Sequence, residues 1–95
     1  MVIHLPLRVG EATVVVPEVL PASLDGLALR TYGRTELAEL YHPETCGKSA
    51  WEKFRYELDL CHGLQRALRD VGYDGKRRSY SPTEVWVIVQ FLDTP

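Results

Sequence analysis

Two short helical patterns separated by a break constrain the fold of this chain more than any other feature. Residues 35–41 carry apolar side chains three and four positions apart, and residues 48–58 carry them every four positions. The break between them contains Pro43 and Gly47, and a proline disfavours helix in the residue before it. Helix-turn-helix proteins join two short helices in this way to present side chains to the major groove of DNA. The pattern therefore predicts a helix-turn-helix unit.

Local signals place the ends of the first and third helices. Thr35 is a good N-cap residue, and Glu36 follows in the first turn, where the helix dipole favours an acid. Residues 62–71 again carry apolar side chains at helical spacing, and Gly72 is suited to end that helix. We therefore expect the first helix to begin at Thr35 and the third to span residues 62–71.

The clearest local signal marks a fourth helix. Ser81 is followed by Pro82, which suits the first helical position, and by Glu84 three residues later. This spacing predicts a capping box, in which the serine and glutamate side chains satisfy free N–H groups of the first turn. The fourth helix should run from there to about Leu92.

The N-terminal residues follow a strand pattern instead. Residues 2–9 alternate in polarity, residues 13–16 are rich in β-branched side chains, and Gly10 between them is a turn residue. A β-hairpin is predicted. A two-stranded ribbon cannot bury its apolar side chains on itself, so it either packs on the helices or pairs with a second copy. Its unpaired edges and its valines favour a homodimer through the hairpin.

The expected fold is mainly α. A four-helix, helix-turn-helix-like domain occupies residues 29–95, and an N-terminal β-hairpin and linker occupy residues 1–28. Pro21 and Gly26 break any long helix in the linker, which we expect to be a loop, with at most one helical turn at residues 23–27.

The charge balance narrows the function. The chain has 11 Lys and Arg against 13 Asp and Glu, a net charge of −2, which argues against a protein that coats nucleic acid non-specifically. The bases are partly clustered, on helix 48–58 and in the segment 76–78. These two segments, with a serine and a tryptophan on the helix, are the predicted DNA contacts: Lys48, Ser49, Trp51, Lys53, Arg55, Lys76, Arg77 and Arg78.

The same residues have a structural alternative. Trp51 can belong to the core, the bases of the helix can form a solvated face, and the 76–78 segment can be an ordinary surface loop.

Reactive groups are sparse. A zinc site of His42, Cys46, Cys61 and His62 is disfavoured, because adjacent residues on a helix point about 100° apart. Free thiols are the simpler state in a reducing cytoplasm. No Gly-rich phosphate loop, GxSxG or HExxH is present. We expect no metal, no cofactor, no small-molecule substrate and no enzymatic activity.

Targeting signals are also lacking in the sequence. No apolar run approaches the roughly 20 residues of a membrane-spanning helix. The first nine residues do not have the charged, apolar and small-residue regions of a secretory signal. We expect a cytoplasmic protein with no membrane contact.

Spaced residues over about 29–95 resemble a known family. They are RTYGRTELAELYHP at 30–43, KSAW at 48–51, GY at 72–73 and RSYSPTEV at 78–85. The pattern is similar to that of domain of unknown function 4248, common in Bacteroidales. The resemblance implies membership and no particular activity, since the family has no assigned biochemistry. Two of its segments are also similar to parts of excisionase-like and winged-helix regulators, a fold-level analogy.

Two functions are open at this point. The first is a small DNA-binding protein, a regulator or mobile-element accessory factor, with helix 48–58 in the major groove of double-stranded DNA. The second is a protein–protein adaptor that uses the same scaffold and binds no nucleic acid.

Overall fold

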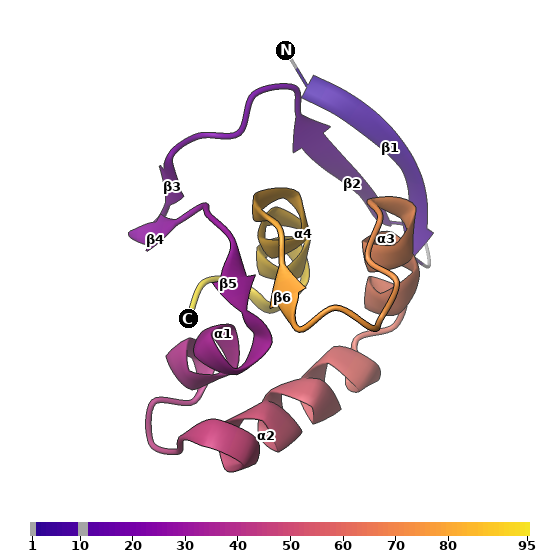
Figure 1. The fold of residues 1–95 in the computed structure, drawn as a ribbon. Coiled ribbons are helices and arrows are strands. Elements are labelled where there is room, and N and C mark those ends of the chain that lie inside the picture. The colour runs from indigo at the N-terminus through magenta and orange to yellow at the C-terminus, as the bar shows by residue number, and fades with distance from the viewer. Residues whose placement is uncertain (1, 10–11) are drawn as a thin grey trace.

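The computed structural model describes residues 2–9 and 12–95, and it describes side chains from Val16 onward. Figure 1 shows the chain from the N-terminus in indigo to the C-terminus in yellow. In chain order the elements are β1 (Val2–Val9), β2 (Ala12–Pro17), β3 (Ser23–Leu24), β4 (Leu27–Ala28), β5 (Tyr32–Gly33), α1 (Arg34–Tyr41), α2 (Gly47–Leu60), α3 (Leu64–Asp70), β6 (Ser79–Tyr80) and α4 (Pro82–Leu92). The predicted mainly helical fold is confirmed. In the part of the chain with described structure, no helix is long and apolar enough to cross a bilayer.

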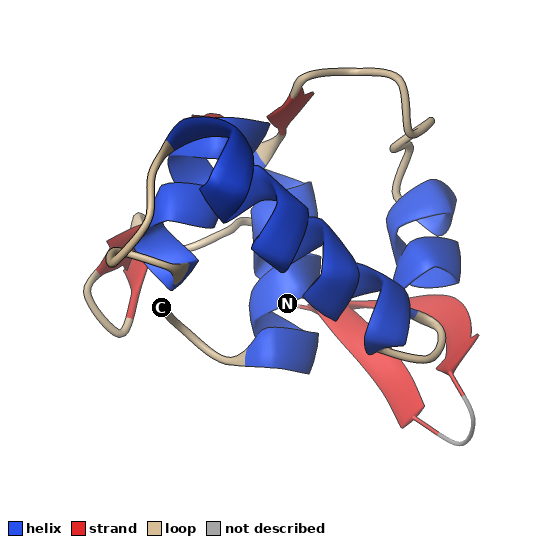
Figure 2. Cartoon of the chain, turned by 90° about the horizontal axis from the view of Figure 1, so that it is seen from below, coloured by secondary structure: helices blue, strands red, loops and turns tan. Residues whose placement is uncertain are grey.

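The N-terminal hairpin packs on the helices. Strands β1 and β2 pair antiparallel, with Ile3 opposite Val16, and the register shifts between His4 and Arg8. β1 contacts α3 and β2 contacts α4, so the hairpin lies along one edge of the helical part (Figures 1 and 2). Val16 is buried in the same core cluster as the helix side chains. The predicted turn residue Gly10 lies outside the described residues, and pairing with a second copy stays a prediction.

The segment expected to be a loop forms a small hairpin instead. β3 and β4 pair with Ser23 opposite Ala28 and Leu24 opposite Leu27. Asp25 and Gly26 connect them, with φ of 49° and 87°. An Asp-Gly pair favours this two-residue turn, because both positions need positive φ. The proposed helical turn at 23–27 was therefore wrong.

A third strand pair joins the start of α1 to the start of α4. β5 and β6 pair with Tyr32 opposite Tyr80 and Gly33 opposite Ser79. The backbone N–H of Arg34 extends the pairing by donating to the carbonyl of Arg78 at 2.9 Å. This contact brings the segment between α3 and β6, which we call the 71–78 loop, beside α1 and α2.

The strand pair also moves the start of α1. Thr35 is not the N-cap, because β5 keeps Gly33 extended and the helix begins directly after it, at Arg34. A capping box has two bonds, one from each side chain, and Gly33 has no side chain to make the first. The second is present, because the Gly33 N–H donates to the Glu36 carboxylate at 3.1 Å. At α2, the free N–H of Gly47 donates to the Glu39 carboxylate of α1 at 2.8 Å, so one helix caps the next.

Helices α2 and α3 differ from prediction at their ends. α2 continues to Leu60 with Cys61 as its C-cap, so residues 61–63 form the turn and α3 begins at Leu64. Gly72 ends α3 as predicted, with φ of 105°. The N–H of Tyr73 donates to the carbonyl of Leu68 at 2.9 Å, the pattern of a Schellman motif. The chain then reverses, and the Tyr73 ring is buried.

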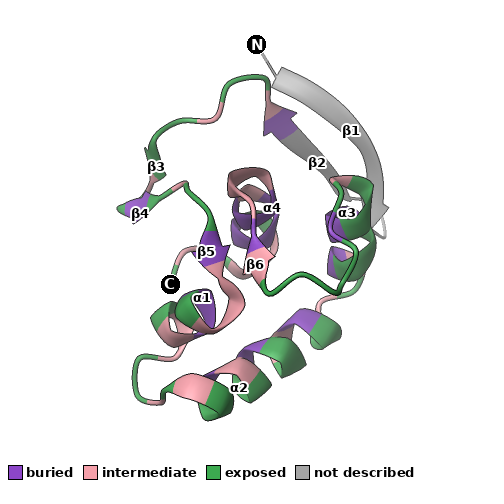
Figure 3. Cartoon of the chain, viewed as in Figure 1, coloured by how far each residue is buried: buried purple, intermediate pink, exposed green. Residues whose placement is uncertain are grey.

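The predicted capping box of α4 is confirmed. The Ser81 hydroxyl accepts from the Glu84 N–H at 3.3 Å, and the Glu84 carboxylate accepts from the Ser81 N–H at 2.8 Å. α4 is buried on more than one face, because Val87 is fully buried as well as Val85 and Ile88. β2, α3 and β6 all contact this helix, and Figure 3 shows it at the centre of the molecule.

Candidate nucleic-acid interface

The solvent-facing side of α2 divides the predicted bases between two flanks. Ala50, Phe54 and Leu58 are buried. Lys53 and Arg55 are two residues apart, so they point about 200° apart around the helix. Figure 3 shows the exposed residues of α2 on the side away from the core.

Each flank has its own charge partners. The Lys53 ammonium lies 3.7 Å from the Glu44 carboxylate in the α1–α2 turn. The Lys48 ammonium lies 3.9 Å from Glu52 on the same helix, and both side chains are largely exposed, so this pair contributes little. Arg55 forms no ion pair within the part of the chain that the structure describes.

Arg55 borders a cleft that we call the α2–loop cleft. Its volume is about 260 Å³, and it lies between α2, α3, β6 and the 71–78 loop. The helix contributes Trp51 and Arg55, and the loop contributes Tyr73 and Gly75. Of the residues predicted as DNA contacts, Trp51 and Arg55 line this cleft, whereas the three loop bases do not. Gly75, the residue before Lys76, borders the cleft from the loop.

Arg34, which was not predicted, is the second cation that lines this cleft. Its guanidinium carbon lies 4.7 Å from the centroid of the Trp51 ring, within the range of a cation–π contact. Trp51 is half-buried, and its ring also packs at 6.3 Å against Phe54 of the core. The structural alternative for Trp51 is thus partly correct, because this side chain touches both the core and the cleft.

Two tyrosines whose rings contact each other form another wall. The rings of Tyr73 and Tyr80 have centroids 4.9 Å apart. The Tyr73 hydroxyl donates to the carbonyl of Arg77 at 3.4 Å. Burial, followed by the neighbouring Tyr73, raises the pKa of Tyr80, so this phenol stays neutral. Asp59, at another side of the cleft, supplies a carboxylate.

The 71–78 loop is held by its own polar contacts. The Asp74 carboxylate accepts from the N–H groups of Lys76 at 2.8 Å and Arg77 at 3.3 Å. These bonds, with the one from Lys76 dominant, lower the pKa of Asp74. The Arg77 guanidinium donates to the carboxylate of Glu84, a side chain only 1% exposed.

The three loop bases consequently differ in what they can contact. Arg77 is bound to a buried carboxylate that also belongs to the α4 capping box. Lys76 and Arg78 are exposed and form no ion pair among the described residues. Ser49 is exposed at the start of α2.

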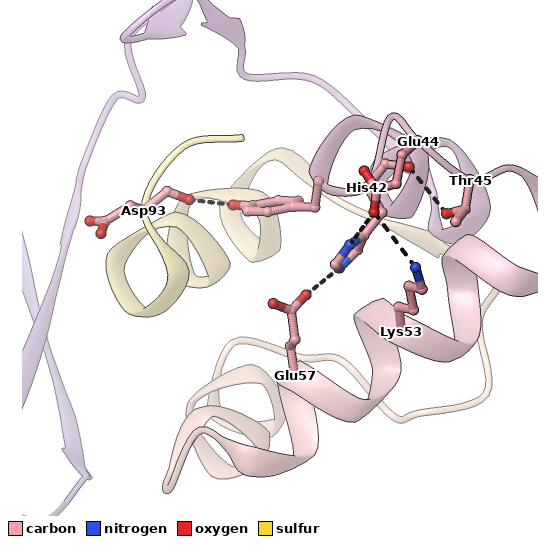
Figure 4. Close-up of polar contacts among 7 residues, drawn as sticks. His42, Glu44, Thr45, Lys53, Glu57 and Asp93 are labelled. Carbon is pink, nitrogen blue, oxygen red and sulfur yellow. Dashed lines mark hydrogen bonds and ion pairs between the residues drawn. The ribbon is translucent and has the colours of Figure 1, made fainter.

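A second polar cluster fixes the α1–α2 turn, as Figure 4 shows. The two ring nitrogens of His42 contact carboxylates on opposite sides: Nδ1 lies 3.3 Å from Glu44, and Nε2 contacts Glu57 of α2. The Tyr41 hydroxyl donates to the backbone carbonyl of Asp93 after α4. Burial raises the pKa of Tyr41. These contacts tie the turn to α2 and to the C-terminal end of the chain.

The cysteines lie at opposite ends of α2. Cys46 is its N-cap and Cys61 its C-cap, so at helical rise they are roughly 20 Å apart along the axis. They cannot share a metal ion in this arrangement. Both are free thiols, and in the described residues no group of three or more His, Cys, Asp and Glu side chains could hold a metal.

The comparison with family models agrees with the arrangement of these elements. A model described as a domain of unknown function, DUF4248, matches residues 28–95. The chain belongs to the DUF4248 family. The DUF4248 match begins at the end of β4 and includes all four helices, the β5–β6 pair and every residue of the α2–loop cleft named above. It leaves the β1–β2 hairpin outside. Comparisons with curated proteins and with solved structures found no match.

Proposed function

We propose that this protein binds double-stranded DNA, with α2 in the major groove and the 71–78 loop on the phosphate backbone. The observation that carries the proposal is the α2–loop cleft, where Arg55 of the helix and Gly75 of the loop border one cavity. The role is binding without catalysis, in a cytoplasmic regulator or mobile-element accessory factor.

Unpaired cations around the cleft support this proposal. In the described part of the chain, Arg34, Arg55, Lys76 and Arg78 form no ion pair with a carboxylate. Arg34 and Arg78 are adjacent through their backbone bond at 2.9 Å. Duplex DNA carries one negative charge per about 1.7 Å of axis, so a local group of cations can gain phosphate contacts although the whole chain is acidic.

The two flanks of α2 suit a helix lying in a groove. The major groove is about 12 Å wide, with a phosphate strand on each side. Lys48 and Arg55 would face one strand and Lys53 the other, while the exposed Ser49 would reach base edges. Asp59 repels phosphate at the C-terminal half of the helix. We therefore place the N-terminal end of α2 deepest in the groove, where the helix dipole also favours phosphate.

Fluorescence anisotropy with a random duplex at about 50 mM salt tests the proposal. Roughly five phosphate contacts give a slope of log affinity against log salt of about −4 to −5. Lys48→Ala together with Arg55→Ala should flatten the slope by about two units. Arg66→Ala, which removes an exposed base of α3, is the matched control and should leave the slope unchanged. No binding at tens of micromolar protein would exclude the DNA function.

The second candidate function is a protein–protein adaptor, and exposed apolar side chains on α2 favour it. Tyr56 is 65% exposed and Leu60 58% exposed, and they lie one helical turn apart. A photo-crosslinking amino acid at position 56 should then give a discrete adduct in cells. The same amino acid at position 66 is the control, and equal labelling from both positions would reject the adaptor function.

A further inference from the structure

The α2–loop cleft combines two cations with little to neutralise them. Two other arginines are paired: Arg30 lies 2.8 Å from Glu36, and Arg77 contacts Glu84. Arg34 and Arg55 line one cavity of about 260 Å³, and no described carboxylate pairs with either. Two like charges facing one space repel each other, so an anion between them would relieve that repulsion.

The setting of Arg34 leaves its hydrogen-bond donors available. One face of the guanidinium lies over the Trp51 ring, and its backbone N–H is held by Arg78. Stacking occupies the face of a guanidinium and leaves the N–H groups at its edge free. Those edge donors match the oxygen atoms of a phosphate group, which a guanidinium can bind through two parallel bonds.

The remaining walls restrict where an anion can sit. Tyr73 and Tyr80 contribute buried rings that exclude water from this side of the cleft, and charge interactions are stronger where water is excluded. Asp59 repels an anion from its own side of the cleft, where its carboxylate accepts from the Gln65 amide at 3.3 Å. The favourable position is therefore between Arg34 and Arg55.

From this geometry we infer that the α2–loop cleft is a binding site for a single phosphate group, held between Arg34 and Arg55. The phosphate can come from a free phosphorylated molecule or from the backbone of a nucleic acid, since both offer the same oxygen atoms. The inference does not depend on DNA binding, because the cleft and its cations are present whichever source supplies the phosphate.

Amide and arginine side-chain NMR signals of the ¹⁵N-labelled full chain test this site. Inorganic phosphate, a nucleoside 5′-monophosphate and a short DNA duplex are titrated separately at matched ionic strength. Signals of Arg34, Trp51, Arg55 and Gly75 should shift together. Arg55→Ala should weaken binding at least about tenfold, and Arg55→Lys should weaken it less because the charge is kept.

Two further variants distinguish binding in the cleft from non-specific attraction of phosphate to the positive charges of the protein. Asp59→Asn removes the repelling carboxylate and should tighten phosphate binding several-fold. Arg66→Ala removes the same charge as Arg55→Ala but lies outside the cleft lining, so its effect should stay within about twofold. Equal weakening by Arg55→Ala and Arg66→Ala would overturn the inference.

The three probes separate the possible sources. Cleft shifts with phosphate or the monophosphate support a free phosphorylated ligand, and cleft shifts with the duplex alone support a backbone phosphate. Duplex binding by anisotropy without cleft shifts would overturn the site and leave the DNA proposal intact. Monophosphate binding in the cleft without duplex binding would support the phosphate site and exclude the DNA function. No cleft shift with any probe at about 20 mM phosphate would also overturn the inference.

Discussion

Replacing Glu84 with glutamine should destabilise the protein far more than an ordinary surface substitution. The Glu84 side chain is 1% exposed, and its two oxygens have separate partners, the Ser81 N–H at 2.8 Å and the Arg77 guanidinium. Glutamine keeps the volume and can still accept from Ser81. Its NH₂ group then faces the donors of Arg77, so a charge-assisted bond is lost and two donors oppose each other.

The size of the effect follows from this loss. Hydrogen bonds to charged groups contribute about 1.5–3 kcal/mol. The Arg77 side chain is 41% exposed, so water can solvate part of the freed guanidinium, and we expect the lower half of that range. A loss of about 2 kcal/mol in the free energy of unfolding lowers Tm by roughly 8–16 °C in a chain of this size.

Thermal and urea unfolding of a double-mutant cycle measures the contribution of the Arg77–Glu84 bond to stability. Glu84→Gln should cost at least about 1 kcal/mol less in an Arg77→Ala background, because the bond is already absent there. Glu52→Gln is the control. Glu52 is exposed, and its ion pair with Lys48 is long, at 3.9 Å, so the substitution should change the free energy of unfolding by under about 0.5 kcal/mol. Additive losses, or a Glu84→Gln variant as stable as the control, would refute this account of the Arg77–Glu84 pair.

Further predictions concern the caps, the loop and the hairpin. Ser81→Ala should lower the free energy of unfolding by about 1 kcal/mol, and Glu39→Ala, which leaves the Gly47 N–H uncapped, by about 0.5–1 kcal/mol; urea titrations measure both. Asp74 has a lowered pKa in the folded state, so its stabilising effect is present above its unfolded pKa and is lost as pH falls through the folded pKa. An NMR titration of its carboxyl carbon should give a pKa below that of an aspartate in the unfolded chain. If the β1–β2 hairpin pairs two copies, light scattering at high micromolar concentration should give the mass of a dimer, and a monomer would reject that pairing. Removing the hairpin should destabilise the helices whatever the mass, because β1 and β2 contact α3 and α4.

Features that depend on neighbouring residues could be predicted from the sequence. The capping box at Ser81 and the end of α3 at Gly72 involve contacts within a few residues, and both are confirmed. The Asp25-Gly26 turn carries an equally local signal, since Asp-Gly is typical of a two-residue hairpin turn. The prediction of a loop used Pro21 and Gly26 only as residues that break a helix. That error came from interpretation, and the signal was present.

Features that depend on distant residues could not be predicted. The β5–β6 pair is two residues long on each side, and Tyr32 is paired with Tyr80 across most of the family domain. Strands this short have no periodicity that would reveal them. The displaced start of α1 and the position of Arg34 in the cleft both follow from this pair. Lys53 and Arg55 were both predicted as DNA contacts of helix 48–58, although helical geometry points them in nearly opposite directions.

The cleft depends on one connected set of contacts, which makes its shape testable without any ligand. Gly72 reverses the chain after α3, Asp74 bonds two loop N–H groups, and Arg77 binds the carboxylate that starts α4. Each bond fixes the next segment, so the loop wall is set by the helix ends on both sides of it. Loosening the start of α4 with Ser81→Ala should therefore raise hydrogen exchange in the 71–78 loop. If exchange rose only in the first turn of α4, the loop wall would be held independently of that helix.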